Sequence, residues 1–318
     1  MIDKIDLKIL EALSKGTVSG ESLSQNLNIT RTAVWKRINK LKEYGYKITS
    51  SPKGYVLKER SDYLLPNEVK PYMNTSFIGK NYLFFKEINS TNKFLKNNDL
   101  KDGTVVVANF QTEGKGRKNR KWVSSGKGIY FSLVLKPNIP VNEMLRFSLI
   151  FPLAITQTLL EYTETFIKWP NDIYLNGKKL SGILIESEIE AEKIDRVVVG
   201  VGININDTEE DLKEVKDIAT SLFIETGKTY YRPEIFGKLL NKVEEYYISY
   251  LTDLDFRKSI VKQVEKFLLW KGEKVVVIDD KQKIEGRLKG LNTLGGVVLD
   301  TEKGTYEIYS GDLSLRKK

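Results

Sequence analysis

A basic loop between Gly114 and Gly128 carries the groups best suited to bind an anion. It contains six lysines and arginines and no acidic residue, and it begins Gly-Lys-Gly-Arg-Lys-Asn-Arg-Lys-Trp. Such a loop repels itself, so we expect it to become ordered when an anion neutralises it. Its glycines let the backbone approach a phosphate closely, and Arg117 and Arg120 can each bind one bidentately. Taken alone, the loop is equally compatible with a solvated or nucleic-acid-binding segment.

The rest of the reactive inventory is limited. The chain contains no cysteine and no histidine. This excludes disulfides, thiolate nucleophiles, imidazole bases and the usual zinc sites, and we expect no tightly bound metal. Catalysis must rely on lysine, arginine, carboxylates, amides and the backbone. Chemistry that depends on positioning and charge neutralisation, such as nucleotidyl transfer, suits that inventory.

Three further segments, taken with the basic loop, resemble the biotin protein ligases. They are Lys-Trp-Pro-Asn-Asp at 168–172, Lys-Leu-Ser-Gly-Ile-Leu at 179–184 and Gly-Val-Gly-Ile-Asn at 200–204. In that family a Gly-Arg-Gly-Arg-x-x-Arg-x-Trp loop closes over biotin and adenylate. The resemblance covers nearly the whole chain. One departure is Lys115, where the family has an arginine, because a lysine keeps the charge but loses the planar fork.

The resemblance implies a two-step reaction. The carboxylate of biotin attacks the α-phosphorus of ATP, which is accompanied by Mg²⁺. Pyrophosphate leaves and biotinyl-5′-AMP remains in the site. The ε-amine of a specific lysine on a biotin carboxyl carrier protein then attacks the acyl carbon, which gives an amide and AMP.

The resemblance also assigns roles to residues, some of which have a plain structural alternative. The catalytic residues are Lys179, Arg117 and Asp172. The biotin contacts are Ser90, Thr91, Asn92, Gln111, Lys115, Gly116, Arg117 and Lys179. The contacts to ATP and the adenylate are Arg117, Arg120, Trp122, Asn171, Asn204 and Arg316.

The alternatives follow from residue type. Ser90 can be a helix N-cap, Gln111 a polar strand end and Lys179 a solvated surface charge. Trp122 can belong to the core and Arg316 to a charged tail. Asp172 can steer or deprotonate the incoming lysine, bind magnesium or hold the turn after Lys168, and these readings stay open. Gly200 and Gly202 lie within a predicted strand, so they are no dinucleotide fingerprint.

Residues 1–62 form a predicted winged helix-turn-helix domain. Apolar residues recur at helical spacing, Ser19 and Thr30 can cap the second and third helices, and residues 46–57 read as a small hairpin. Residues 1–60 hold twelve lysines and arginines against six acids, so six of the nine net positive charges lie there. A basic end of this kind favours a polyanionic partner. The expected DNA contacts are Arg31, Thr32, Trp35, Lys36 and Lys53. A helical protein-interaction cap is the alternative.

Residues 63–268 read as an α+β domain with a mixed sheet, similar to the ligase domain that is distantly shared with class II aminoacyl-tRNA synthetases. Strands are expected at 82–85, 104–110, 129–135, 173–175, 180–185 and 197–204, with a hairpin turn at Asn176-Gly177. Long helices are expected at about 143–162 and 233–267. Residues 269–318 show five short strands, which predict a small SH3-like β-barrel. The fold class is therefore α/β and multi-domain.

The first functional interpretation is a biotin–protein ligase that also represses biotin genes, because the bifunctional members of the family carry such an N-terminal domain. Biotinyl-AMP would favour a homodimer that spans a two-fold operator. One alternative is a DNA-binding ligand sensor without catalysis, which Lys115 weakly favours. Another is a lipoate or octanoate ligase, against which the segment 168–172 argues. The N-terminus lacks a signal-peptide core and no apolar run is long enough to span a membrane, so we expect a cytoplasmic protein with no membrane partner.

Overall fold

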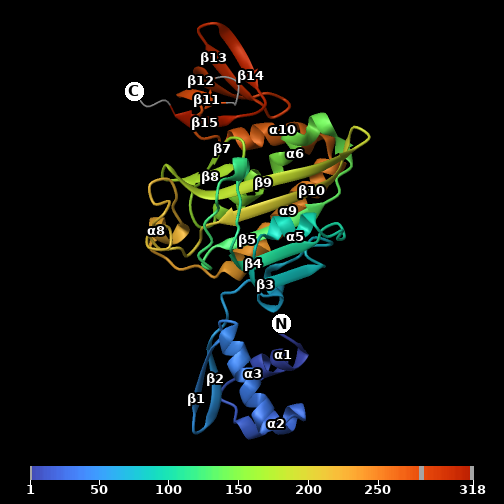
Figure 1. Cartoon of the computed structure of the whole chain (residues 1–318), viewed down its shortest axis with the longest axis vertical. Helices are drawn as coiled ribbons and strands as arrows, with labels where there is room; N and C mark the ends of the chain where they lie inside the picture. The colour runs from blue at the N-terminus through green and yellow to red at the C-terminus, as the bar shows by residue number, and fades with distance from the viewer. Residues whose placement is uncertain (1, 279–282, 316–318) are drawn as a thin grey trace. The chain divides into compact units, whose positions relative to one another are not determined.

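The computed structural model describes residues 2–278 and 283–315, so Arg316 lies outside the described residues. The chain divides into two compact units, Met1–Val69 and Lys70–Lys318. Both can be followed in Figure 1.

The first unit has the three helices and the wing that the sequence predicts. Ser19 and Thr30 cap α2 and α3 by accepting hydrogen bonds from the backbone of Ser22 and Ala33. The wing is the antiparallel pair β1 and β2. The elements are α1 (Lys4–Ser14), α2 (Gly20–Leu27), α3 (Arg31–Glu43), β1 (Lys47–Ser51), β2 (Gly54–Glu59) and α4 (Pro66–Val69).

A buried carboxylate joins α1 to α3. Asp6 has no exposed surface and accepts hydrogen bonds from Arg37 at 2.7 Å and Lys40 at 2.6 Å. Asp3 caps α1 and also contacts Arg37. A buried charge must be paired, so these contacts hold two basic side chains of α3 against α1. The remaining exposed residues of α3 include Arg31, Thr32, Trp35 and Lys36.

The second unit is built on an eight-stranded mixed sheet. Its strand order is β3-β4-β5-β10-β9-β8-β7, with β6 paired to β10. Only β3 and β4 run parallel among these pairs. The strands are β3 (Tyr82–Ile88), β4 (Val105–Gln111), β5 (Ile129–Leu135), β6 (Ile139–Pro140), β7 (Phe166–Lys168), β8 (Asp172–Leu175), β9 (Lys178–Glu190) and β10 (Lys193–Ile203).

Helices cover both faces of this sheet. Alternate residues of a strand point to opposite faces. Val134 of β5 packs in one apolar cluster with Leu95 of α5, whereas the Phe131 ring lies 4.8 Å from Phe236 of α9. The two helices therefore lie on opposite faces of β5. The helices of this unit are α5 (Thr91–Lys96), α6 (Met144–Ser148), α7 (Ile150–Leu159), α8 (Leu222–Thr226), α9 (Arg232–Thr252) and α10 (Leu254–Glu265), with short 3₁₀ turns at η1 (Lys70–Tyr72), η2 (Arg117–Asn119) and η3 (Val141–Glu143).

Two predicted long helices are each divided in the structure. The stretch at 143–162 breaks at Leu149 into α6 and α7, because Pro152 has no N–H to continue the hydrogen bonding of the preceding turn. The stretch at 233–267 breaks at Asp253, whose side chain caps α10 by accepting from Asp255 at 2.8 Å and Phe256 at 3.1 Å. The predicted turn at Asn176-Gly177 is confirmed, with positive φ at both residues.

The C-terminal part of the second unit is a five-stranded antiparallel sheet with the order β14-β13-β12-β11-β15. Glu265 of α10 accepts a hydrogen bond from the backbone of Leu291 at 2.6 Å, which ties the sheet to that helix. The strands are β11 (Lys274–Ile278), β12 (Lys283–Leu291), β13 (Val297–Thr301), β14 (Gly304–Ile308) and β15 (Asp312–Leu315).

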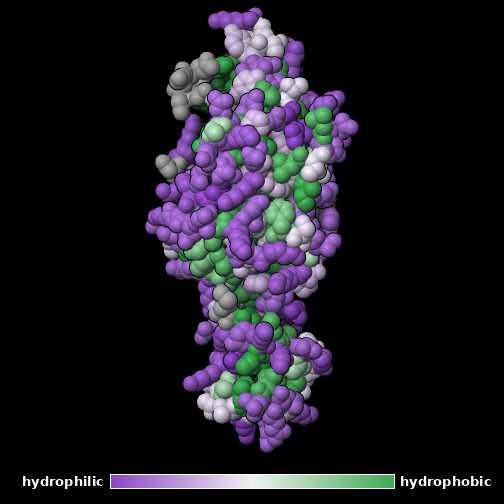
Figure 2. Space-filling model, turned by 90° about the vertical axis from the view of Figure 1, so that its right-hand side faces the viewer, coloured by the Kyte–Doolittle hydropathy of each residue, from purple (hydrophilic) through white to green (hydrophobic). Residues whose placement is uncertain are grey.

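Hydrophilic side chains cover most of the face drawn in Figure 2, and apolar side chains appear there in small patches. Within residues 2–278 and 283–315, the structure has no helix that is both long and apolar enough to cross a membrane.

Candidate active site

One cavity of about 390 Å³ in the second unit collects the residues that the sequence assigned to ligand binding. Except for Arg316, which lies outside the described residues, every predicted contact to biotin or adenylate lines it. They come from the start of α5, the end of β4, the basic loop, the residue before β8, the strand β9 and the residue after β10. Segments far apart in sequence therefore meet at a single site.

Polar groups of α5 and β4 form one wall. Ser90 is the N-cap of α5, as its residue type suggests. Gln111 Oε1 accepts a hydrogen bond from the backbone N–H of Thr91 at 2.9 Å and lies 3.1 Å from the Thr91 hydroxyl. Thr91 and Asn92 are buried. A wall of hydroxyls and amides suits a neutral polar group better than a charged one.

Three strand glycines form the floor. A Cβ atom at Gly200 would lie 2.1 Å from Asn92 Oδ1, and one at Gly202 would lie 2.4 Å from the Trp122 ring. A Cβ at Gly182 would lie 3.0 Å from the same ring. The glycines therefore let two side chains lie flat against the sheet. Their role is close approach, in keeping with the prediction that they lie in a strand.

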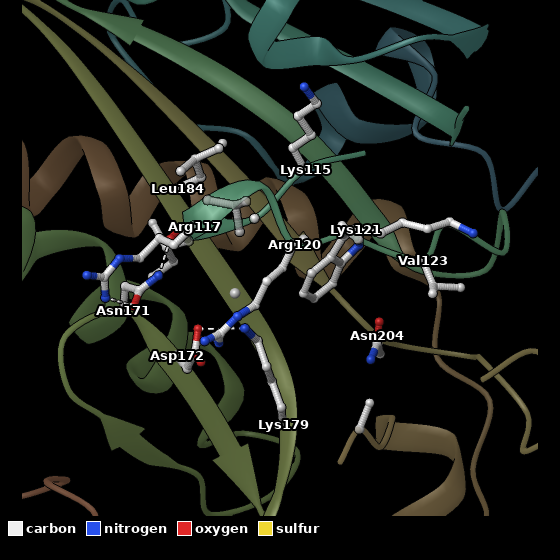
Figure 3. Close-up of a pocket in the computed structure, with 18 of the residues that line it drawn as sticks. Lys115, Arg117, Arg120, Lys121, Val123, Asn171, Asp172, Lys179, Leu184 and Asn204 are labelled. Carbon is white, nitrogen blue, oxygen red and sulfur yellow. Dashed lines mark hydrogen bonds and ion pairs between the residues drawn. The ribbon is translucent and has the colours of Figure 1, made fainter. Parts of the chain in front are cut away.

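An ion pair occupies the centre of the site. Lys179 of β9 lies 2.7 Å from the carboxylate of Asp172, and its ammonium lies 5.7 Å from the centre of the Trp122 ring. Figure 3 shows the two charged side chains pointing toward one another. Lys179 is about one-third exposed, so it is held in the cavity wall and is not a free surface charge.

The basic loop is neutralised in part by a carboxylate from the C-terminal sheet. Arg120 donates a hydrogen bond to Asp312 of β15 at 2.9 Å. Arg117 and Lys118 lie 3.8 Å and 3.9 Å from the same carboxylate. The anion that the loop requires is thus supplied by the protein itself. Nothing in the local pattern around Asp312 indicates this contact, because the two segments are nearly 200 residues apart.

Not all cations of the loop point to the centre. Lys115 and Lys121 point away from the Asp172–Lys179 pair (Figure 3). Lys121 lies 3.4 Å from Glu214, on the segment that follows Asn204. Between them, the loop is closed by backbone hydrogen bonds from Gly116 to Arg120 and from Trp122 to Gly114.

The Lys-Trp-Pro-Asn-Asp segment connects the loop to the sheet and to the C-terminal part. The Asn171 side chain accepts a hydrogen bond from Arg117 at 3.1 Å and donates to the backbone of Ile183. Trp169 is buried and donates its indole N–H to Gly295 at 2.9 Å. The segment is therefore fixed on both sides, and it holds Asp172 opposite Lys179.

Two buried donors beside the cavity have no hydrogen-bond partner in the part of the chain that the structure describes. They are the indole nitrogen of Trp122 and the hydroxyl of Ser124. Buried polar groups are nearly always satisfied, so such donors are candidates for contacts with a bound molecule. Trp122 is half-buried and lies over glycines, which places it in the site and not in the core.

The segment after β10 forms a side of the cavity that sequence reasoning missed. Leu212, Val215 and Ile218 line it, and Ile218 is 66% exposed. Asn204 donates to the backbone of Thr220 at 2.8 Å and so anchors the end of this segment. At its start Asp207 accepts from Ser125 and from the backbone of Ile205 at 3.0 Å, and burial raises the pKa of the Asp207 carboxyl.

The structure places the predicted DNA contacts on the first unit. Arg31, Thr32, Lys36 and Lys53 are exposed, and Trp35 is 56% exposed. The opposite side of α3 is buried. In helix-turn-helix domains the exposed side of the recognition helix is the one that enters the major groove.

Comparison with known proteins agrees with this arrangement. Residues 84–204 match the biotin/lipoate A/B protein ligase family, residues 6–56 match an HTH domain and residues 272–316 match the biotin protein ligase C-terminal domain. The chain is 35% identical over 307 residues to the bifunctional ligase/repressor BirA of Bacillus subtilis, with 94% of each chain covered. The chain belongs to the biotin protein ligases.

Other ligases support the assignment. BirA of Escherichia coli is 27% identical over 331 residues, with 98% of this chain and 97% of that protein covered. The biotin protein ligase of Aquifex aeolicus, solved in complex with biotin and ATP, matches with a TM-score of 0.66 and 37% identity. The match covers 75% of this chain and all of that one. Most of the residues that line the cavity lie within 84–204, the range that matches the biotin/lipoate A/B protein ligase family.

Proposed function

We propose that this ligase activates biotin with ATP and transfers it to a lysine of a biotin carboxyl carrier protein. The observation that carries the proposal is the cavity in which Lys179, the basic loop and a wall of neutral polar groups meet. A carboxylate and a phosphate repel each other as they approach, and a cation between them offsets that repulsion. In this proposal Lys179 supplies that cation.

The first step joins biotin to the nucleotide. A biotin carboxylate oxygen bonds to the α-phosphorus, the bond from that phosphorus to the bridging oxygen breaks, and pyrophosphate leaves. Ser90, Thr91, Asn92 and Gln111 bind the ureido ring. Lys115 and Gly116 complete the biotin side, and Asp172 holds the ammonium of Lys179 in line.

The nucleotide lies on the other side of the cavity. Arg117 and Arg120 hold the phosphate, which replaces the carboxylate of Asp312 as their anionic partner. The rest of the adenylate is contacted by Trp122, Asn171, Asn204 and Arg316. The indole N–H of Trp122, which has no partner among the residues that the structure describes, supports this assignment. Magnesium accompanies ATP, because the phosphate oxygens of the nucleotide are ligands that it prefers.

The second step releases AMP. The ε-amine of the acceptor lysine attacks the acyl carbon of biotinyl-AMP, loses a proton and forms the amide, and the bond to the phosphate oxygen breaks. Closure of the basic loop over the adenylate keeps water and stray amines away from the anhydride until the acceptor docks.

The first unit acts as the DNA-binding domain of a biotin-responsive repressor. Arg31, Thr32, Trp35 and Lys36 of α3 enter the major groove, and Lys53 of the wing contacts the backbone. Biotinyl-AMP favours a homodimer that binds a two-fold operator. The domains span residues 1–62, 63–268 and 269–318, the last as an SH3-like barrel, and the protein acts in the cytoplasm.

Biotin-dependent exchange of labelled pyrophosphate into ATP tests the ligase function. We expect exchange with biotin and none with lipoate or octanoate. Folded protein that binds biotin without exchange would instead be a catalytically silent sensor. In that case Lys115→Arg, which restores the family residue, is the first variant to measure.

A further inference from the structure

Four side chains form a hydrogen-bonded row behind the polar wall of the cavity. Asn92 Nδ2 donates to Glu186 Oε2 at 3.0 Å, and the other end of the same amide, Oδ1, accepts from Ser132. The Ser132 hydroxyl also lies 2.6 Å from the Thr91 hydroxyl. Thr91 and Asn92 line the cavity, but Ser132 and Glu186 lie outside its lining. The row joins β9, α5 and β5.

Glu186 fixes which atom is the donor in each hydrogen bond of this row. Lys96 lies 2.8 Å from its carboxylate. Burial alone would raise the pKa of Glu186, but hydrogen bonds from Lys96 and Asn92 outweigh it and hold the pKa below the usual range. An ionised carboxylate can only accept hydrogen bonds, so Asn92 must turn its NH₂ group toward Glu186 and its carbonyl oxygen toward Ser132.

The orientation of Asn92 in turn determines where the hydroxyl protons of Ser132 and Thr91 lie. An amide oxygen only accepts, so the single hydroxyl proton of Ser132 lies on its bond to Asn92. The 2.6 Å contact between the two hydroxyls therefore uses the proton of Thr91. Gln111 lies further from the Thr91 hydroxyl, at 3.1 Å, and its oxygen already accepts the Thr91 backbone N–H at 2.9 Å.

We propose that Ser132 and Glu186 are positioning residues that commit the Thr91 hydroxyl to accepting a hydrogen bond from a ureido N–H of biotin. The proposal rests on the proposed function, since it names how the same pocket selects its ligand. A ureido ring carries two N–H donors and one carbonyl acceptor, so a hydroxyl free to rotate could bind either. A hydroxyl whose proton is already donated to Ser132 can only accept, so it binds a ureido N–H and not the ureido carbonyl.

The burial of Ser132 supports this role. It has no exposed surface and lies in the strand Ile-Tyr-Phe-Ser-Leu-Val-Leu, all of which is buried. A buried hydroxyl in an apolar strand costs stability unless it is hydrogen-bonded. Ser132 meets this requirement through Thr91 and Asn92, the two residues of α5 that face the cavity.

The experiment measures the dissociation constants of biotin and of ATP separately by calorimetry. In Ser132→Ala the Thr91 hydroxyl loses its 2.6 Å acceptor and keeps only the longer contact to Gln111 at 3.1 Å, so its proton is held less firmly. We expect biotin to bind about three- to tenfold more weakly with little change for ATP. Glu186→Gln can donate as well as accept, so Asn92 can reverse, and biotin binding weakens in the same direction. Ser187→Ala, an exposed serine beside Glu186 on β9, is the matched control.

A double-mutant cycle with Thr91→Val separates positioning from a general loss of structure. We expect Thr91→Val to cost less in the Ser132→Ala background than in wild type, because Ser132 acts through that hydroxyl. Additive effects, or equal weakening of biotin and ATP, would overturn the proposal.

The outcomes distinguish this proposal from the proposed function. Wild-type protein without biotin-dependent pyrophosphate exchange would refute the function itself. Exchange in wild type, combined with a folded Ser132→Ala variant that binds biotin within twofold of wild type, would refute only the positioning role. Should Ser132→Ala fail to fold, Glu186→Gln decides the matter, and unchanged biotin binding there counts against the proposal.

Discussion

At the scale of single residues, charge placement decides the chemistry. Lys179 is held between Asp172 and the face of Trp122, where a cation can lie between two approaching anions. We expect Lys179→Gln to slow biotinyl-AMP formation by about a hundredfold or more, measured as single-turnover formation of labelled adenylate. Lys178→Gln is the control. Lys178 precedes Lys179 on the same strand, but it is exposed and donates to the backbone oxygen of Lys216. An equal loss in both variants would argue against a specific role.

Arg117 gives a second prediction at this scale. If Arg117 retains the mixed anhydride, Arg117→Gly releases biotinyl-AMP, which then biotinylates lysines on unrelated proteins. Serum albumin added to the reaction and probed with labelled streptavidin measures this leakage. Lys121→Gly, at a cation of the same loop that points away from the centre, should leave albumin unlabelled. An Arg117→Gly variant that stays selective for its acceptor would show that other residues retain the intermediate.

At the scale of elements, one carboxylate fastens a loop to a helix. Glu244 of α9 accepts hydrogen bonds from Ile78 at 2.7 Å, from Phe77 at 3.0 Å and from Ser76. Burial acts to raise its pKa, but these hydrogen bonds outweigh it and lower the pKa below the usual value. The charged form is therefore the one that stabilises the fold.

Glu244→Gln should lower the free energy of unfolding by about 2 kcal/mol at neutral pH, because an amide nitrogen would face N–H donors. A depressed carboxyl pKa contributes stability above the unfolded-state pKa of about 4.3, and this is lost as the pH falls through the folded-state value. The difference between wild type and variant should therefore shrink in acid. Urea unfolding at neutral and acid pH measures it, with the exposed neighbour Glu245→Gln as control. A pH-independent difference would contradict the assignment to charge.

At the scale of the whole molecule, the two compact units carry separate tasks. Arg37 and Lys40 are paired with Asp3 and Asp6, whereas Arg31 and Lys36 are exposed on α3. Each phosphate contact that is lost lowers the dependence of DNA affinity on salt. A double substitution of these two residues by alanine therefore reports on the DNA-binding surface alone.

We expect that double variant to reduce the slope of log affinity against log salt by about two on a duplex of random sequence, with unchanged pyrophosphate exchange. Fluorescence anisotropy measures the slope. The pair Lys4→Ala and Lys8→Ala removes the same charge from α1 and should change the slope much less. Equal effects of the two pairs would mean that net charge, and not the surface of α3, governs binding.

The sequence by itself determined the local elements and the chemistry of the site. Helix caps at Ser19, Thr30 and Ser90, the turn at Asn176-Gly177 and the buried strand at 129–135 are set by short-range preferences, and each is confirmed. The family motifs also identified the residues that line the cavity. These features are readable because they depend on neighbours within a few positions.

Only the tertiary structure decided which side chains meet across long separations. Arg120 of the basic loop donates to Asp312, Trp169 donates to Gly295 and Asn92 donates to Glu186, although the members of these pairs are 192, 126 and 94 residues apart. Register and packing place these partners, and no local pattern encodes them. The break at Asp253 has a local cause, since Asp253 caps α10 through the backbone of Asp255 and Phe256, a signal that the apolar periodicity does not mark. Periodicity reports which face of an element is buried, but not what covers it.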